Sequence, residues 1–450
     1  MRGFFAVALV LHLNVPAQSQ LLAGPMLGQV ELRTAKIWVE VAPSVKKVQL
    51  QYAAQQQPAR NMVANYSGAL GRSFNPVTFN LEGLQPNTTY NYSIIVDGKP
   101  LQKARTFTTK ELWQWRKPAP DFSFLTGSCA YFNEPQYDRP GKPYGGDSSI
   151  FETMAGEQSA FMLWLGDNWY TREVDYSDRW GLWYRAQHDR KSPVLQKLLQ
   201  AMPHYATWDD HDYGPNDIGG HYILKEESKK VFDAYWANPS SGQGGEGIYT
   251  RFSYSDADFF LCDDRWWRSA DETKDSIAGK PNGDKHMLGA KQLEWLKNSL
   301  LHSTATFKLV VVGSQVLNPR SAKDKLKSFP VEYADLTDFL EFNKINGVVF
   351  MSGDRHHSEV IKVDRPGSYP LYDITVSSLT AGTVGFTGPE KDSPYRLLGI
   401  DKNNYGRISV AGGKGARTLS ITFLGTKGEK LGEWSVNETA LQTPAKNRDH

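Results

Sequence analysis

The chain has 450 residues, which is too long for one ordinary domain and predicts two. Hydrophobic residues make up 40% and charged residues 22% of the sequence, the balance of a folded globular protein and not of a disordered chain. The formal net charge of +2 comes with no concentrated basic patch, so composition gives no support to binding of nucleic acid or of a membrane surface.

Residues 1–19 differ in composition from the rest of the chain. A short basic start is followed by an apolar run from Phe4 to Leu13 and by small residues at Ala17 and Ser19. This pattern is typical of a general secretory signal peptide, so we expect a secreted or periplasmic protein; a buried N-terminal helix is the alternative. No later segment approaches the roughly 18 consecutive apolar residues of a membrane-spanning helix, so we expect no integral membrane segment.

Residues 20–110 predict a small all-β sandwich. Short strand-like runs are separated by turn residues and show no helical periodicity. The segment from Leu84 to Tyr92 places a proline-led turn before a strand with alternating aromatic residues, and it resembles the tyrosine corner of fibronectin type III domains. Residues 111–120, rich in tryptophan and proline, are expected to form a linker.

Residues 121–440 change to strands that alternate with helices. Short apolar runs typical of buried strands cover residues 122–126, 160–165, 204–207, 308–312 and 347–351. Helices are expected at residues 193–201, 226–236, 291–301 and 335–343, and further strands at 371–376, 418–423 and 433–436. This alternation predicts a layered α/β domain.

Four polar clusters follow predicted strands, which is where α/β folds place their ligands. The clusters are Gly127–Tyr131, Gly166–Tyr170, Trp208–Asp217 and Ser352–Glu359. Each cluster alone could be a helix cap or a hydrogen-bonded turn. The third contains four consecutive ionisable residues, Asp209 to Asp212, whose burial without a cation would be costly. Together the four clusters indicate side chains that converge on one metal site.

In order and content the clusters resemble the motifs of metallophosphoesterases. The second cluster has Asp167 and Tyr170 in a Gly-Asp-x-x-Tyr order, the third has Asp210 in place of the common Asn, and the fourth has Asp354 in place of the first His. With the Ser-Cys-x-Tyr sequence around Cys129, they resemble the PhoD-type alkaline phosphatases. The resemblance implies a layered sandwich of two β-sheets flanked by helices, preceded by a small fibronectin-III-like β-sandwich.

The resemblance also implies two metal positions bridged by Asp167. The ligands expected at the first are Cys129, Asp167, Tyr170 and His356. Tyr131 is expected to support or join this position. A thiolate and a phenolate on one ion suit a strongly Lewis-acidic metal, and the resemblance implies Fe³⁺.

The second metal position is expected to be rich in carboxylates. Its expected ligands are Asp167, Asp210 and Asp354, with Asn216 as a carbonyl ligand. An all-oxygen set suits a hard cation, so we expect Ca²⁺ in preference to Zn²⁺ or Mn²⁺.

Three further residues are expected to act on the substrate, with an aspartate orienting one of them. His211 would protonate the leaving group or stabilise charge, with Asp209 or Asp212 orienting its ring. Arg185 and Arg355 are expected to hold phosphate oxygens, which a guanidinium binds in a bidentate manner. Surface salt bridges are the alternative for both arginines.

The chain has only two cysteines, Cys129 and Cys262. Cys129 is expected to be a metal ligand and Cys262, at the end of an apolar strand, a buried inert thiol. One disulfide between them is the alternative, and it would contradict the first metal position.

These patterns predict a secreted, metal-dependent phosphoesterase that hydrolyses phosphate mono- or diesters with a metal-activated water. The expected substrates are small phosphate esters, including phospholipid or nucleotide-derived diesters, and the expected state is a monomer. The alternatives are a phospholipase D-like phosphodiesterase and a non-enzymatic cell-surface binding protein with structural metals. The N-terminus has one Arg, unlike the twin-Arg signal common in the family, and no amphipathic C-terminal helix is present, which predicts a more open active site.

Overall fold

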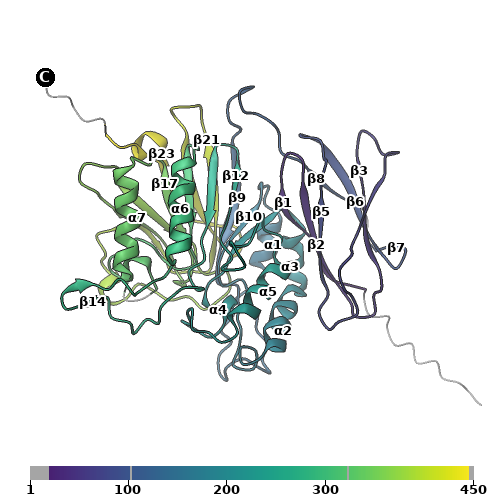
Figure 1. Cartoon of the computed structure of the whole chain (residues 1–450), viewed down its shortest axis with the longest axis horizontal. Coiled ribbons are helices and arrows are strands. Elements are labelled where there is room, and N and C mark those ends of the chain that lie inside the picture. Colours follow the sequence, from purple (N-terminus) through teal and green to yellow (C-terminus); the bar gives the residue numbers. More distant parts are fainter. Residues whose placement is uncertain (1–19, 102–103, 322–323, 445–450) are drawn as a thin grey trace, which may run out of the picture.

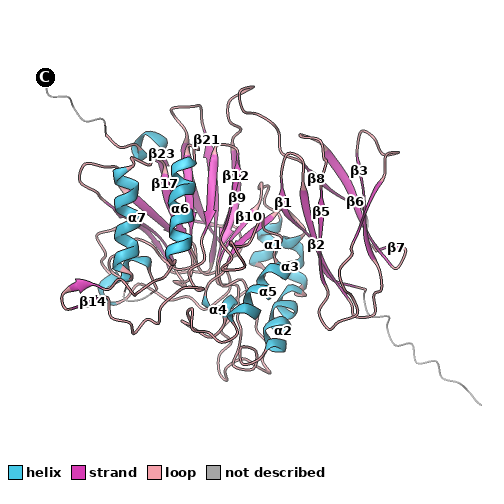
Figure 2. Ribbon diagram, in the orientation of Figure 1, coloured by secondary structure: helices cyan, strands magenta, loops and turns pink. Residues whose placement is uncertain are grey.

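The computed structural model describes residues 20–101, 104–321 and 324–444, so the predicted signal peptide at residues 1–19 lies outside it. Two parts lie side by side: an N-terminal part built only of strands, and a larger part in which helices cover the strands (Figures 1 and 2). Within the described ranges, none of the helices combines the length and the apolar character that a membrane crossing requires.

The N-terminal part consists of two antiparallel sheets around a shared apolar core. One sheet has the order β1 (Leu21–Val30), β2 (Ala35–Val41), β5 (Pro76–Leu81). The other has the order β4 (Met62–Asn65), β3 (Val48–Ala54), β6 (Thr89–Val96), with β7 (Lys99–Pro100) and β8 (Arg105–Thr108) both paired to β6. The Tyr90 hydroxyl accepts a hydrogen bond from the Gln85 backbone N–H at 2.9 Å, which is the geometry of a tyrosine corner.

Two larger sheets form the centre of the second part. The six-stranded sheet has the order β11 (His204–Thr207), β10 (Met162–Leu165), β9 (Phe122–Gly127), β21 (Asn404–Ala411), β22 (Thr418–Gly425), β23 (Lys430–Asn437). The seven-stranded sheet has the order β12 (Thr250–Tyr254), β13 (Ala257–Leu261), β16 (Phe307–Val311), β17 (Val348–Ser352), β19 (Leu371–Thr375), β18 (Ser358–Val363), β20 (Arg396–Ile400). Strands β9, β10 and β11 run parallel, as do β13, β16, β17 and β19. Every residue of β10 and β17 is buried, as expected for parallel strands covered on both faces.

Helices cover the outer faces of both sheets. The helices α6 (Ala290–His302) and α7 (Pro330–Phe342) pack against the seven-stranded sheet. On the six-stranded sheet lie α1 (Ile150–Ala155), α2 (Arg179–Arg190), α3 (Pro193–Leu199) and α5 (Lys225–Tyr235). The two cores meet at β9, where Phe124 faces the other sheet and Leu125 faces the helices. The predicted fold class, two sheets flanked by helices after an all-β part, is confirmed.

Short elements complete the chain. They are α4 (Asp210–Tyr213), the hairpin of β14 (Ser276–Ile277) and β15 (Lys280–Pro281), and the 3₁₀ turns η1 (Leu326–Ser328), η2 (Gly388–Glu390) and η3 (Glu438–Leu441).

The sandwich packs tightly on the helices of the second part. Trp38 of β2 is fully buried, and its indole N–H donates to the Ala234 carbonyl at 2.8 Å. The buried guanidinium of Arg190 stacks 3.8 Å above the Trp236 ring and also lies 5.5 Å from Trp38 and 6.0 Å from Trp169. Aromatic faces attract a cation in this way, so they hold an arginine between the two parts.

Candidate metal centre

The candidate metal centre forms where loops leave the carboxyl ends of parallel strands in both sheets. The loops after β9, β10 and β17 approach so closely at Gly353 that a Cβ there would lie 2.6 Å from the Leu165 carbonyl oxygen and 2.7 Å from the Ser128 side chain. Only glycine allows this approach, which brings the fourth polar cluster against the first two.

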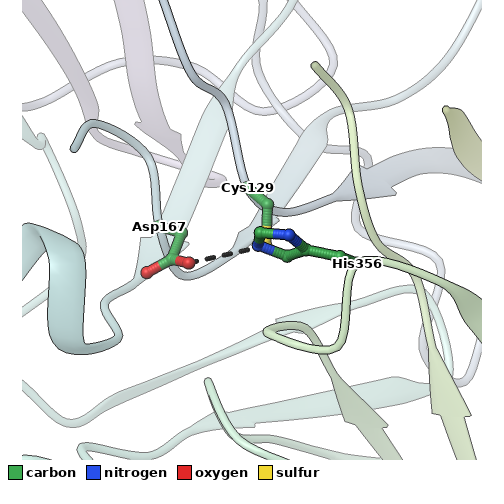
Figure 3. Close-up of side chains that lie close together, drawn as sticks. All are labelled: Cys129, Asp167 and His356. Carbon is green, nitrogen blue, oxygen red and sulfur yellow. Dashed lines mark hydrogen bonds between the residues drawn. The ribbon is translucent and has the colours of Figure 1, made fainter. Parts of the chain in front are cut away.

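Side chains of Cys129, Asp167 and His356 point toward one another (Figure 3). Their ligand atoms lie within 4.8 Å of one another, and the Cys129 thiol donates to Asp167 Oδ2 at 3.5 Å. The Tyr170 hydroxyl lies 3.0 Å from Asp167 Oδ2 and 3.1 Å from His356 Nε2. The structure therefore brings together all four side chains expected at the first metal position.

Ser377, which the sequence patterns do not single out, connects two members of this group. Its hydroxyl donates to the Cys129 sulfur at 3.1 Å and accepts from the His356 backbone N–H at 2.9 Å. Serine after a strand has no distinctive spacing, so only the three-dimensional structure reveals this contact.

The backbone at the candidate ligands adopts an uncommon conformation. The φ angles are +59° at Cys129, +51° at Asp167, +67° at Asp354 and +55° at His356. Non-glycine residues seldom adopt positive φ, and such strained positions are retained mainly at functional sites. The strain thus supports a functional role for loops that the motifs had already indicated.

A second group adjoins the first through Asp167. Ligand atoms of Asp167, Asp210 and His211 lie within 4.8 Å of one another. Asp210 Oδ2 accepts the Asp217 backbone N–H at 2.7 Å, whereas buried Asp210 Oδ1 and Asp354 Oδ2 have no hydrogen-bond partner among the described residues. Buried oxygens of this kind normally have a hydrogen-bond partner, so two carboxylate oxygens without one fit the binding of a cation.

Electrostatics point in the same direction. Burial, and then neighbouring acidic groups, raise the pKa of Asp167 and Tyr170 well above their usual values. Burial likewise raises the pKa of the Cys129 thiol to about 11, and burial with Asp324 and Asp210 raises the pKa of Asp354 to about 7. Like-charged acids crowded in a dry site favour their neutral forms unless a cation is present. The residues present therefore fit a pair of metal ions.

The structure corrects the expected role of Asp209. The His211 ring stacks on Tyr170 at a centroid distance of 4.1 Å, and His211 Nδ1 has no hydrogen-bond partner in the described part of the chain. The buried Asp209 carboxylate instead pairs with Arg265, and the Asp212 carboxylate accepts the backbone N–H groups of Asn168 at 2.8 Å and of Asp209 at 3.0 Å. Both carboxylates therefore bind other groups and do not orient the His211 imidazole.

Arg185 does not reach the metal centre, contrary to the expectation that it holds phosphate. Its fully buried guanidinium pairs with Asp175 at 2.7 Å, Glu134 at 2.8 Å and Asp189 at 3.4 Å. Complete burial also contradicts the alternative of a surface salt bridge. The guanidinium forms salt bridges with three carboxylates, so the role of Arg185 is structural.

Arg355 lies beside Asp354. Its guanidinium is 3.9 Å from Asp354 Oδ2 and 3.1 Å from Glu390, and its Nε has no hydrogen-bond partner among the described residues. The buried Nε–H of Arg355 is therefore a hydrogen-bond donor without a partner in the described part of the chain.

Tyr131 and Asn216 lie at the edge of the centre. The Tyr131 hydroxyl donates to Asp138 at 2.7 Å and its ring packs edge-on against Tyr170, so Tyr131 supports the first group from outside. Asn216 is exposed, and both residues line a cleft of about 510 Å³ that also includes Tyr170 and His211. The cleft gives solvent a path to the centre.

Both cysteines are buried free thiols, which excludes the alternative of a disulfide between Cys129 and Cys262. A further acidic group of Asp217, Asp271 and Asp324 lies nearby. Arg268 pairs with Asp271 at 2.8 Å and with Asp324 at 2.6 Å, and thus already supplies a countercharge there.

Family models match both parts of the chain. The PhoD-like phosphatase family model matches residues 124–403, and a domain of unknown function (DUF7800) matches residues 18–111. Alkaline phosphatase D of Bacillus subtilis (strain 168) is 25% identical over 326 residues, which are 62% of this chain and 52% of that protein. The chain therefore spans about half the length of this curated relative.

Two solved structures share the fold. PhoD superposes with a TM-score of 0.74 at 18% identity, covering 95% of this chain and 92% of that chain. A purple acid phosphatase from yellow lupin (Lupinus luteus) superposes with a TM-score of 0.66 at 11% identity, covering 92% of this chain and 74% of that chain. Because the family model spans more than half of the sequence, the chain belongs to the PhoD-like phosphatase family.

Proposed function

We propose that the chain is a metal-dependent phosphoesterase that hydrolyses phosphate mono- or diesters outside the cytoplasm, after export by the predicted signal peptide at residues 1–19. The observation that carries this proposal is the meeting of Cys129, Tyr170 and His356 around the carboxylate of Asp167. Membership of the PhoD-like phosphatase family supports it. The proposed substrates are small phosphate esters, including phospholipid or nucleotide-derived diesters.

The donor chemistry supports two unlike metals. The thiol, phenol and imidazole of Cys129, Tyr170 and His356 would hold Fe³⁺, and Asp167 would bridge to a second position. Asp210 and Asp354, with Asn216 at the cleft, would hold Ca²⁺, which prefers several oxygen ligands. Bound together, two such ions supply the Lewis acidity that hydrolysis of a phosphate ester requires.

The chain's own residues would bind the substrate and move protons. His211 lines the cleft with an uncommitted Nδ1, and we assign it a hydrogen bond or a proton to the leaving-group oxygen. The Arg355 guanidinium, whose side chain is 22% exposed and lies 3.9 Å from Asp354, would hold a phosphate oxygen.

The cleft beside the ligands favours catalysis over a purely structural metal site. Structural sites are closed by protein ligands, whereas catalytic sites keep a position open to solvent or substrate. Here Tyr170 and His211 line a space of about 510 Å³. A phospholipase D-like specificity remains within this proposal, because every diester presents the same phosphate to the metals.

Elemental analysis and activity assays on one purified sample test the proposal. We expect iron and calcium in the protein, hydrolysis of a chromogenic phosphate monoester or diester, and loss of turnover when a calcium chelator removes calcium but leaves iron. Restoration by added calcium is the control. Full turnover after removal of both metals would contradict the metal-dependent mechanism, and the ratio of the two rates distinguishes monoesterase from diesterase.

A further inference from the structure

The loop between β9 and α1 places a tyrosine directly against one candidate iron ligand. The Tyr144 hydroxyl lies 2.9 Å from His356 Nδ1, and the two rings are 5.9 Å apart. The other nitrogen of the same imidazole, Nε2, lies 3.1 Å from the Tyr170 hydroxyl and faces the group of Cys129 and Asp167. The two nitrogens of His356 thus point to different partners.

Neighbouring groups hold the Tyr144 ring in this place. It packs edge-on against Tyr131 at a centroid distance of 4.9 Å, and a Cβ at Gly382 would lie 3.2 Å from it. Tyr144 is nevertheless 44% exposed and lines the cleft. A half-exposed ring contributes little to the core, so removal of its hydroxyl leaves the fold intact.

An imidazole binds a metal through a nitrogen that carries a lone pair, which requires the proton to sit on the other nitrogen. A hydrogen-bond acceptor at that second nitrogen fixes both the tautomer and the ring orientation. We propose that Tyr144 is a positioning residue whose hydroxyl accepts the Nδ1–H of His356 and thereby directs Nε2 toward the iron position. The inference rests on the proposed function, because it requires iron at that position.

The backbone of Gly382 is a second candidate for fixing the tautomer of His356. The Gly382 backbone also hydrogen-bonds to the His356 ring and raises its pKa, against the larger lowering by burial. If Gly382 alone fixed the tautomer, the Tyr144 hydroxyl would be dispensable. The two possibilities therefore predict opposite results for a variant that lacks only the hydroxyl.

The test compares Tyr144→Phe with a matched control, Tyr137→Phe, in the same loop. The Tyr137 hydroxyl accepts a hydrogen bond from the Gln136 side chain at 3.2 Å, whereas the Tyr144 hydroxyl contacts His356. The readouts are the iron retained after a chelator challenge and the visible phenolate-to-iron absorption band. We expect Tyr144→Phe to retain iron about 10-fold less well and to shift the band, as for other residues that orient a metal-binding histidine. Tyr137→Phe should match the wild type.

A third variant separates an acceptor role from a packing role. Tyr144→Gln restores a carbonyl acceptor without the ring, and we expect it to recover part of the iron retention. Wild-type iron retention and absorption in Tyr144→Phe would overturn the inference in favour of Gly382. A wild type that binds iron but hydrolyses no phosphate ester would overturn the proposed function alone, and a wild type that binds no iron would overturn both.

Discussion

Buried arginines near the candidate metal centre form salt bridges with carboxylates of the protein. Arg265 is fully buried and pairs with Asp209, and Asp210 and Asp324 also lie within 3.9 Å and 3.8 Å of its guanidinium. Its positive charge helps to lower the pKa of Asp210, against the opposing effect of burial and together with His211. Asp210 therefore remains ionised, as a ligand of a hard cation must be.

Arg185 allows a direct test of a structural against a catalytic arginine. We expect Arg185→Met to lower the free energy of unfolding by about 3–5 kcal/mol, because Asp175 and Asp189 would stay buried without a countercharge. Denaturant unfolding measures the loss, and KM of the folded fraction should not change. A higher KM at unchanged stability would contradict the structural role.

Asp354 tests the oxygen-rich metal position. We expect Asp354→Asn to weaken calcium binding roughly tenfold or more while iron is retained, because one negative ligand is removed without a change of size. Calcium titration and elemental analysis measure the two metals separately. Asp364→Asn is the control, since the Asp364 side chain is 78% exposed and pairs with Lys362 on the surface. Equal loss of iron and calcium would place Asp354 at the first position instead.

Strand β18 is fixed in its sheet by a buried carboxylate. Glu359 accepts hydrogen bonds from Gln315 at 2.7 Å and Asn318 at 2.9 Å, and pairs with Arg396 of β20 at 2.7 Å. Strand β18 follows the turn that carries Asp354 and His356. The Glu359 contacts therefore support the backbone on which two candidate ligands depend.

The same carboxylate predicts a dependence of stability on pH. Burial acts to raise the pKa of Glu359, but the nearby His357 imidazole and hydrogen bonds from Arg396 and Gln315 outweigh it and lower the pKa from 4.5 to about 2. A lowered folded-state pKa stabilises the protein above the unfolded value, and this stability is lost as pH falls from about 4.5 toward 2. The contribution is about 3 kcal/mol at neutral pH. Unfolding measured from pH 6 to 3 should show a shallower fall for Glu359→Gln; parallel curves would contradict the assignment.

The sequence predicts best those elements whose apolar pattern faces a core. The helices at α3, α5, α6 and α7 and the strands β9, β11, β16 and β17 occur within a few residues of the predicted ranges. Helix α2 was not predicted, because its buried face includes Arg185, Gln187 and Asp189 and so has no apolar stripe. Helix α1 has only six residues, too few for a periodic signal.

Some residues of the candidate site could also be predicted from the sequence, and others could not. Residues within motifs, such as Cys129, Asp167 and His356, could be identified because they follow strands in a recognisable order. Arg265, Ser377 and Tyr144 could not, because their importance comes from contacts across 56, 248 and 212 positions of the chain. Pairing at such distances depends on the fold and leaves no local pattern.

At the scale of the whole molecule, the sandwich and the larger part share one buried interface. Trp38 of the sandwich packs on Tyr235 at a centroid distance of 5.7 Å, and the Lys36 ammonium donates to the Asn238 carbonyl at 2.6 Å. At Gly28 of the sandwich, a Cβ would lie 2.3 Å from Ala237. Contacts this close leave no room for the two parts to slide against each other.

A substitution at Trp38 tests how much this interface contributes to the stability of the whole chain. We expect Trp38→Ala to lower the free energy of unfolding by about 3–5 kcal/mol, through lost burial and a lost hydrogen bond to Ala234. Trp115→Ala is the matched control, because Trp115 is fully exposed. Calorimetry should show lower thermal stability for the first variant only. Equal behaviour of the two variants would mean that the sandwich is held by other contacts.

The placement of Arg190 has a consequence for engineering. Its guanidinium lies 5.5 Å from the Trp38 ring and 6.0 Å from the Trp169 ring, and Trp169 is the residue before Tyr170. A truncated chain that starts at residue 121 would lack Trp38. It would thus uncover the Arg190 guanidinium and the indole ring beside it. The remaining fragment would expose an apolar and charged surface next to the loop that carries Tyr170. We therefore expect that the sandwich cannot be replaced as an independent domain.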